Sequence, residues 1–189
     1  MIKYGFWIAL VCFGVACGHT SSTTVQENRP NDIKGDEPIA PKLLIVPGAG
    51  IGYIKLNENA DSVVKAMGKP DKQDAAMGAM LMTWYNSHDT TRYQTTIYAH
   101  HNFGAKDEAV SHVKMIRITS PLYQTSKWAH VGFPLDSLQK LYHPNKNSRS
   151  VYDDVKAGIA FELGASNRCS AIIVHAPGDS SGAYLDTRQ

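Results

Sequence analysis

The sequence predicts an α+β domain built from two helix-plus-antiparallel-sheet units in tandem, of which the second is shorter. A capped amphipathic helix lies within residues 50–71, and the segments that follow are rich in aromatic and β-branched residues, which favour strands. The same order of helix and strand returns in shorter form after residue 123. We therefore expect a domain at residues 42–178, with units at about residues 46–121 and 123–177, after a signal peptide and a flexible linker.

The N-terminal segment has the features of a secretion signal. Lys3 gives a positive start, and residues 5–16 form an apolar run that is shorter than the roughly 20 residues of a membrane-spanning helix. The run ends in Gly-Val-Ala before Cys17, which resembles the lipobox of bacterial lipoproteins in the looser form found in Bacteroidota. The resemblance implies removal of residues 1–16 and lipid modification of Cys17. The alternative is an ordinary cleaved signal beside an incidental cysteine.

Two further segments lie outside the expected domain. Residues 17–41 are rich in Ser, Thr, Asn, Asp, Glu, Gly and Pro, which predicts a flexible linker between the lipid and the domain. Residues 179–189 are expected to form a flexible tail. The lipobox resemblance implies an outer-membrane anchor. Bacteroidota lipoproteins that are exported to the surface usually have an acidic run after the lipidated cysteine, and no such run follows Cys17 here. We therefore expect the domain to face the periplasm; a secreted or cell-surface location is the alternative.

Charge and cysteine content limit the classes of function. The chain has 19 Lys and Arg against 17 Asp and Glu, and its basic residues are scattered, which argues against a nucleic-acid surface. Cys12 lies in the expected signal peptide, and Cys17 would carry lipid. Cys169 is then the one thiol of the mature chain, so the sequence predicts no internal disulfide.

The first unit is expected to contain one helix and a three-stranded meander. It begins with the glycine-rich stretch 47–52 (PGAGIG), but a dinucleotide fingerprint would require a helix directly afterwards, so these glycines indicate turns. Asn59 is the expected N-cap of the helix, and Gly68 is its expected end. The predicted strands lie within residues 80–85, 93–101 and 113–119, after an earlier extended segment at residues 42–46.

The helix pattern of the second unit lies within residues 133–142. Asp136 and Ser137 align there with Asp61 and Ser62, an offset of 75 residues, whereas the last strands of the two units align with an offset of 56. The second unit is therefore shorter by 75 − 56 = 19 residues, about one hairpin arm with its loop. Between its helix and its last strand, residues 157–163 form the one clear strand. Coincidence between two helix–sheet segments is the alternative to duplication.

Two family resemblances follow from these patterns. Residues 50–71 (GIGYIKLNENADSVVKAMGKPD) resemble the opening of SmpA/BamE-type outer-membrane assembly lipoproteins, in which a helix ending in Gly-x-Pro precedes a meander. The tandem arrangement resembles the β-lactamase-inhibitor-protein-like fold, which contains two such units. The resemblance covers roughly residues 46–177 and implies a fold more than an activity. The second unit departs from the single-unit assembly lipoproteins.

Side chains suited to catalysis or metal binding form no recognisable motif. His100, His101, His112 and His175 are candidate metal ligands on neighbouring strands, but their spacing matches no zinc motif, and we interpret them as structural or surface residues. Cys169 and His175 fall about 20 Å apart on one predicted strand, too far apart for a nucleophile and its base. We therefore expect no catalytic residue, no metal and no cofactor.

One group of side chains is a candidate contact for a protein partner. Met80, Met82, Trp84 and Tyr85 concentrate polarizable and aromatic groups, which favour adaptable binding faces. Alternation along a strand would instead place the first three of them in the core, and this is the simpler interpretation.

These observations favour a lipid-anchored periplasmic envelope protein that acts as a non-enzymatic protein-binding or scaffolding module. The tandem resemblance implies an alternative, an inhibitor or immunity protein that blocks a partner enzyme with its sheet face. An enzyme with an unrecognised site is a third interpretation.

Overall fold

The computed structural model describes residues 38–147 and 150–179. The chain divides into two compact units, residues 1–36 and 37–189, and all described residues belong to the second. The expected signal peptide, Cys17 and linker residues 17–37 lie outside the described residues, as do residues 180–189 of the expected tail.

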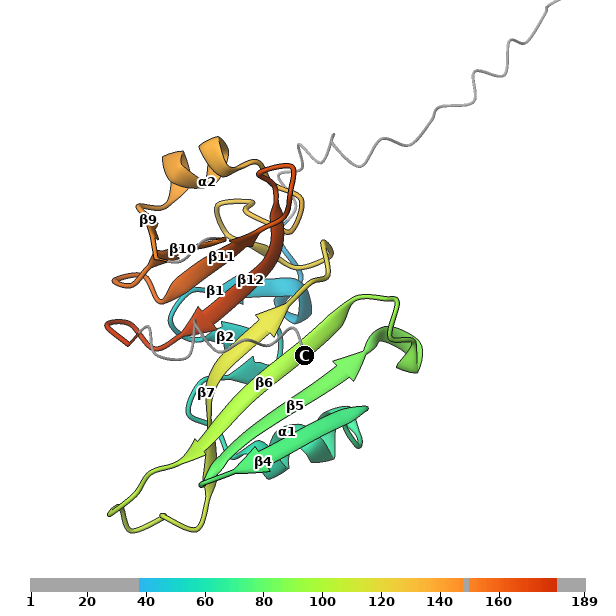
Figure 1. Ribbon diagram of the computed structural model, residues 1–189, viewed down its shortest axis with the longest axis vertical. Helices are drawn as coiled ribbons and strands as arrows, with labels where there is room; N and C mark the ends of the chain where they lie inside the picture. Colours follow the sequence, from blue (N-terminus) through green and yellow to red (C-terminus); the bar gives the residue numbers. More distant parts are fainter. Residues whose placement is uncertain (1–37, 148–149, 180–189) are drawn as a thin grey trace, which may run out of the picture. The chain divides into compact units, whose positions relative to one another are not determined.

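The described part of the chain is an α+β fold with two sheets and two α-helices, which confirms the predicted class (Figure 1). Helix α1 is Ala60–Met67 and helix α2 is Leu135–Leu141; short 3₁₀ turns lie at Pro41–Leu43 and Asn86–His88. The large sheet has eight antiparallel strands in the order β4 (Lys72–Ala76), β5 (Ala79–Tyr85), β6 (Gln94–His101), β7 (Ser111–Ile118), β12 (Cys169–His175), β11 (Ile159–Leu163), β10 (Val151–Asp154) and β9 (Asn145–Lys146).

The small sheet forms from the start of the described chain and the segment before α2. Its order is β3 (Ile54–Lys55), β2 (Gly50–Ile51), β1 (Leu44–Val46) and β8 (Gln124–Thr125), and β1 pairs with β8 in parallel. Two glycines of the PGAGIG stretch, Gly48 and Gly52, have φ values of 69° and 58°. Gly50 has no such φ, but a Cβ there would collide with the carbonyl oxygen of Ile54 on β3. The interpretation of these glycines as turn residues is confirmed for Gly48 and Gly52, whereas Gly50 lies in strand β2.

Helix α1 begins and ends as the sequence predicts. The Asn59 side chain accepts a hydrogen bond from the amide of Asp61 at 2.8 Å, and Gly68 ends the helix with φ 86°. The N-terminal end of the helix is also tied to β7, because the Val113 amide donates to the carbonyl of Glu58 at 2.9 Å. The buried stripe of α1 contains Ala60 and Val63.

The strand content differs from the prediction in both halves of the chain. A fourth strand, β4, precedes the expected meander, and β9 and β10 lie between α2 and the strand expected at residues 157–163. The expectation of a missing hairpin arm is therefore wrong. Each helix is followed by four strands of the large sheet, of 5, 7, 8 and 8 residues after α1 and of 2, 4, 5 and 7 residues after α2.

The physical reason for these misses is the absence of an apolar alternation. All five residues of β4 (KQDAA) are exposed, and β10 carries two consecutive aspartates. These segments extend because they pair with a stronger neighbouring strand, and tertiary pairing of this kind overrides local propensity.

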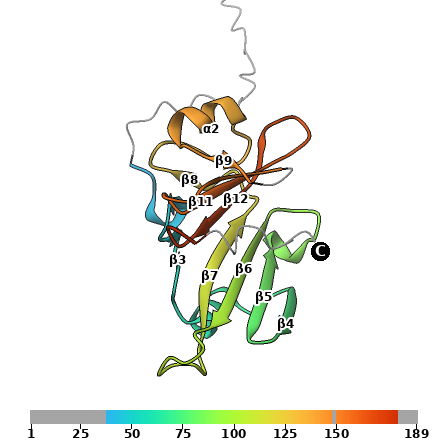
Figure 2. The ribbon, with the colours of Figure 1, turned by 60° about the vertical axis from the view of Figure 1, so that its left-hand side comes forward.

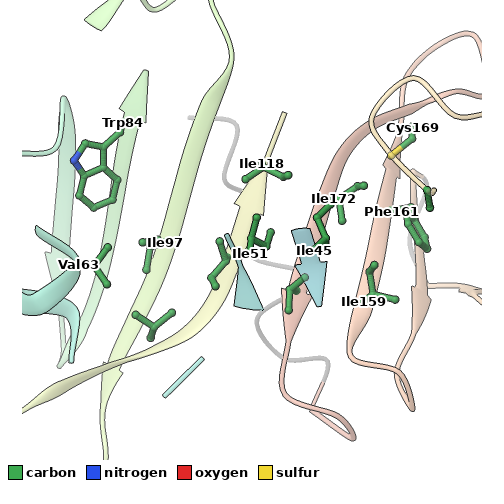
Figure 3. Packing of buried hydrophobic residues seen from close by; sticks show 14 of the residues in the cluster. Ile45, Ile51, Val63, Trp84, Ile97, Ile118, Ile159, Phe161, Cys169 and Ile172 are labelled. Atoms are coloured by element: carbon green, nitrogen blue, oxygen red, sulfur yellow. The ribbon is translucent and has the colours of Figure 1, made fainter. Parts of the chain in front are cut away.

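The main core lies between one face of the large sheet and the layer formed by both helices and the small sheet. Ile97, Ile118 and Ile172 come from the large sheet, Val63 from α1 and Ile45 from β1, and all are at most 3% exposed (Figure 3). Strands β4 to β7 lie side by side, with β12 and β11 next to them (Figure 2). The opposite face carries a second, smaller cluster of Met115, Val151, Ala160 and Ile173.

Candidate functional site

The four candidate partner contacts do not share one environment. Met82 is fully buried, Trp84 is 6% exposed, and Met80 packs against the same core from a partly buried position. Met82 therefore cannot contact a partner in this conformation. Trp84 and Tyr85, at the end of β5, line a groove with residues that the sequence did not single out.

This groove, hereafter the aromatic groove, has a volume of about 360 Å³ and lies where β5 ends and β6 begins. One side is the last residue of α1, a second is the β5–β6 loop, and a third is the segment after β7. Its lining residues are Met67, Trp84, Tyr85, Asn86, Ser87, His88, Tyr93, Gln94, Thr95, Ser120, Leu122 and Tyr123.

Three large apolar side chains that line the groove are exposed. Leu122 is 65% exposed, Tyr93 is 47% exposed and Met67 is 36% exposed, and the three come from three separate segments. Single exposed apolar residues are ordinary, and what distinguishes these three is that they line one concavity. Trp84 is held in place because its indole N–H donates to the carbonyl of Gly68 at 2.9 Å.

The β5–β6 loop is well ordered by its own hydrogen bonds. The Asn86 amide donates to the Tyr93 carbonyl at 2.8 Å and closes the loop. Asp89 accepts from both the amide and the hydroxyl of Thr91, which lowers the pKa of its carboxyl. Ser87 takes a left-handed conformation with φ 57°. A wall that is already organised loses little entropy on binding, which favours affinity.

The charges near the groove are paired with one another. Asp71 accepts from the Tyr85 amide at 2.7 Å and from His88 Nδ1 at 2.6 Å, and these bonds, the first most strongly, lower the pKa of Asp71. The remaining polar lining consists of amides and hydroxyls, such as Asn86, Gln94 and Ser120. The groove therefore suits an uncharged group with apolar and hydrogen-bonding parts.

The four candidate metal ligands occupy β6, β7 and β12. His100 and His112 are direct cross-strand neighbours, and each of the four histidines already has a hydrogen-bond partner through Nδ1. Within residues 38–147 and 150–179, no three side chains of His, Cys, Asp or Glu form a group that could hold a metal ion. His100, His101 and His175 do line one cleft of about 340 Å³, together with Lys114 and Asp179.

His175 is part of a buried ion pair that the sequence did not reveal. Its Nε2 lies 3.1 Å from Asp153 Oδ1 and its Nδ1 lies 3.0 Å from the Ala176 carbonyl, and both side chains of the ion pair are 1% exposed. Both ring nitrogens therefore lie within hydrogen-bond distance of an oxygen atom. Burial lowers the pKa of His175, but the hydrogen bond and charge of Asp153 together with hydrogen bonds to Ala176 and Asp179 outweigh burial, and the pKa is raised.

Cys169, at the other end of β12, is a structural thiol. It is 3% exposed, and burial raises its pKa to about 12. A thiol this hard to ionise is a poor nucleophile.

The groove residues Met67, Tyr93 and Leu122 were missed because each stands alone beside a turn in the sequence. Gly68, the β5–β6 loop and Pro121 mark the three turns, but nothing local indicates that they meet.

Comparison with protein-family models, curated proteins and solved structures gives no match to this chain. Neither described helix is long and apolar enough to cross a membrane.

Proposed function

We propose that this chain is a lipid-anchored protein of the bacterial envelope that acts as a non-enzymatic protein-binding or scaffolding module. Lipid on Cys17 would hold it to the outer membrane, with the domain facing the periplasm. The observation that carries the binding role is the aromatic groove, where Met67, Tyr93 and Leu122 are exposed around a concavity with paired charges. Tyrosine and tryptophan are enriched among the residues that dominate binding energy at protein interfaces.

The groove further suggests what the partner presents. A volume of about 360 Å³ accommodates one or two side chains rather than a folded surface. We infer that the partner inserts an aliphatic or aromatic side chain from an uncharged loop or extended segment. We expect the partner's backbone to bond the polar lining, to which Gln94, Thr95 and Ser120 contribute amide and hydroxyl groups.

The binding proposal is tested with a photo-crosslinking amino acid at Leu122 in intact envelopes, and with the same group at Tyr53 as control. Tyr53 is 77% exposed and does not line the groove. A reproducible protein adduct at position 122 that is absent at position 53, and that Tyr93→Ser weakens, supports the proposal. Equal adducts at both positions, or none, refute it. The anchor is tested separately by intact mass, since Cys17→Ser should abolish the lipid.

A second candidate function is inhibition of a partner enzyme through the sheet face. What favours it is the continuous eight-stranded sheet, whose one face receives neither helix. A stable complex with a purified envelope hydrolase, lost on substitution of Tyr98 but kept in Tyr93→Ser, would favour this candidate over the groove.

We also infer that the two halves of the domain are copies of one unit. The helices begin at Ala60 and Leu135, an offset of 75, and the fourth residue of each, Val63 and Leu138, is buried. In the pairing of β7 with β12, Ile118 lies opposite Ile172 and Ile116 opposite Val174. The last strands of the two halves align with an offset of 56 residues, so Ile118 corresponds to Val174 and Ile116 corresponds to Ile172. The alignment therefore turns one of these two cross-strand pairs into the other. A two-fold axis through the pair of Arg117 and Ile173 explains this symmetry.

A further inference from the structure

Strand β4 ends the large sheet and leaves one of its edges open. Among the strands of the described chain, β4 pairs with β5 alone and stands last in the sheet order (Figure 2). All five of its residues (KQDAA) are exposed, and none of them is proline. The strand at the opposite end of the sheet, β9, has only two residues. An open edge presents backbone N–H and C=O groups with which another extended segment can pair, and β4 is the longer of the two outer strands.

The hydrogen bonds around the β4–β5 turn determine which backbone groups of β4 point outward. Gly78, directly before β5, accepts from the His101 amide of β6 at 3.1 Å. Bonding direction alternates along an antiparallel strand, so the residue after Gly78 bonds to its cross-strand partner Ala76 on β4. The same alternation along β4 turns the backbone groups of Gln73 and Ala75 away from β5, toward the open edge.

The side chains of β4 carry opposite charges two residues apart. Lys72 and Asp74 therefore project from the same face of the sheet, with the uncharged Gln73 between them in the sequence. Among residues 38–147 and 150–179, neither charge belongs to a salt bridge. The Lys72 ammonium lies instead over the ring of Tyr85, 5.7 Å from its centre. The order of positive, neutral and negative side chains is complementary to the same order read in reverse.

The strand can pair with the β4 of a second copy across a two-fold axis. Because bonding directions alternate, the axis must pass through a residue rather than between two residues. An axis at Gln73 places Lys72 of each copy opposite Asp74 of the other, which forms two ion pairs. An axis at Lys72 or at Asp74 would place two like charges opposite each other, which is destabilising. An axis at Ala75 would leave each Asp74 opposite an uncharged Ala76.

We propose that the chain forms a two-fold homodimer in which the two β4 strands pair antiparallel about Gln73 and join two large sheets into one. The outward backbone groups of Gln73 exchange hydrogen bonds across the axis, and the two Lys72–Asp74 pairs flank it. Complementarity of the strand to its own reversed copy favours a second copy over another partner. The contact is short, so the dimer is weak. It does not depend on the proposed function, because no residue of β4 lines the aromatic groove.

A cysteine at the axis tests the geometry in the full chain. Residues of a hydrogen-bonded antiparallel pair have Cα atoms about 5.5 Å apart, within the range that a disulfide spans. Gln73→Cys should therefore give a disulfide-linked dimer on mild oxidation, at a higher yield than Tyr53→Cys, which is 77% exposed in its parent residue and lies outside β4. The parent chain measures the contribution of the native cysteines. A yield no higher than that of Tyr53→Cys, or lower than that of Asp74→Cys, overturns the proposal.

An exchange of charges tests the two ion pairs. Lys72→Asp turns both attractive contacts into repulsive ones and should raise the dimer dissociation constant at least about tenfold in sedimentation equilibrium. Adding Asp74→Lys restores both pairs with reversed signs and should return the constant to within a few-fold of the parent's. Both residues are exposed, so the variants should keep the fold, which circular dichroism checks. A parent chain that is monomeric at about 1 mM, or a dimer that Lys72→Asp does not weaken, overturns the proposal.

Discussion

The buried ion pair of Arg117 and Glu162 gives the sharpest prediction for stability. The two side chains form two parallel N–H···O bonds between β7 and β11 and are 5% and 12% exposed. Glu162→Leu removes the carboxylate and leaves a buried guanidinium with no counter-charge. Loss of one partner of such a pair costs about 3–5 kcal/mol. The guanidinium stays charged at any ordinary pH, so it cannot escape the penalty by losing its proton.

The double variant Arg117→Met, Glu162→Leu should recover most of this loss. Both charges are then absent, and side chains of similar length fill the space, so we expect stability within about 1–2 kcal/mol of the parent. Arg92→Met is the matched control, because the Arg92–Asp89 pair at 3.2 Å is 58% and 44% exposed. An exposed pair contributes about 0–1 kcal/mol.

Urea unfolding followed by tryptophan fluorescence and circular dichroism measures these free energies. The three tryptophans of the chain include Trp84, which lies in the main core and reports its loss. The reasoning is refuted if Glu162→Leu alone costs less than about 1 kcal/mol, or if the double variant is as unstable as the sum of the two singles.

Three further predictions concern single positions. Although burial lowers the pKa of His175, Asp153 and the hydrogen bonds to Ala176 and Asp179 raise it overall. The stability that this group contributes is therefore fully present below its unfolded pKa of 6.5 and is lost as pH rises through the folded pKa. Urea unfolding between about pH 6 and 9 should show this decline, and His175→Gln should remove it. Asn59→Ala should cost about 1 kcal/mol by thermal or urea unfolding, because the Asp61 amide loses its cap, whereas Asn59→Asp should cost little. Gly50→Ala should lower the melting temperature more than Gly68→Ala does. A Cβ at position 50 would meet the Ile54 carbonyl oxygen, whereas a Cβ at position 68 would meet nothing within 4 Å. Equal losses would contradict the close approach of the Gly50 backbone to Ile54.

The sequence predicted those features of the fold that have local chemical signals. The Asn59 cap, the Gly68 stop and the alternation of Met80, Met82 and Trp84 are each decided within a few residues, and the structure confirms them. Strand β4 has no local signal, since it extends by pairing with β5. The ion pair of Asp153 and His175 was missed for the same reason: Asp153 lies on β10, a strand that the sequence did not predict.

The aromatic groove was beyond local reasoning because its sides come from segments far apart in the chain. Met67 is the last residue of α1, Tyr93 directly precedes β6, and Leu122 follows Pro121. Each is an unremarkable apolar residue beside a turn. Strand pairing in the large sheet and the packing of α1 against it bring the three turns to one groove.

The loop that forms one wall of the aromatic groove is longer than the connection between the second and third strands after α2. The loop between β5 and β6 covers residues 86–93, whereas the corresponding connection between β10 and β11 covers residues 155–158. On the proposed alignment of the two halves, the 19 additional residues of the first lie in longer strands and longer loops rather than in an extra hairpin arm. One of those longer loops is the preorganised wall that carries Tyr93. If the halves are copies of one unit, the proposed binding site lies where the copies have diverged. Shortening residues 86–93 to the length of the second connection should then abolish the crosslink at Leu122 while the domain still folds.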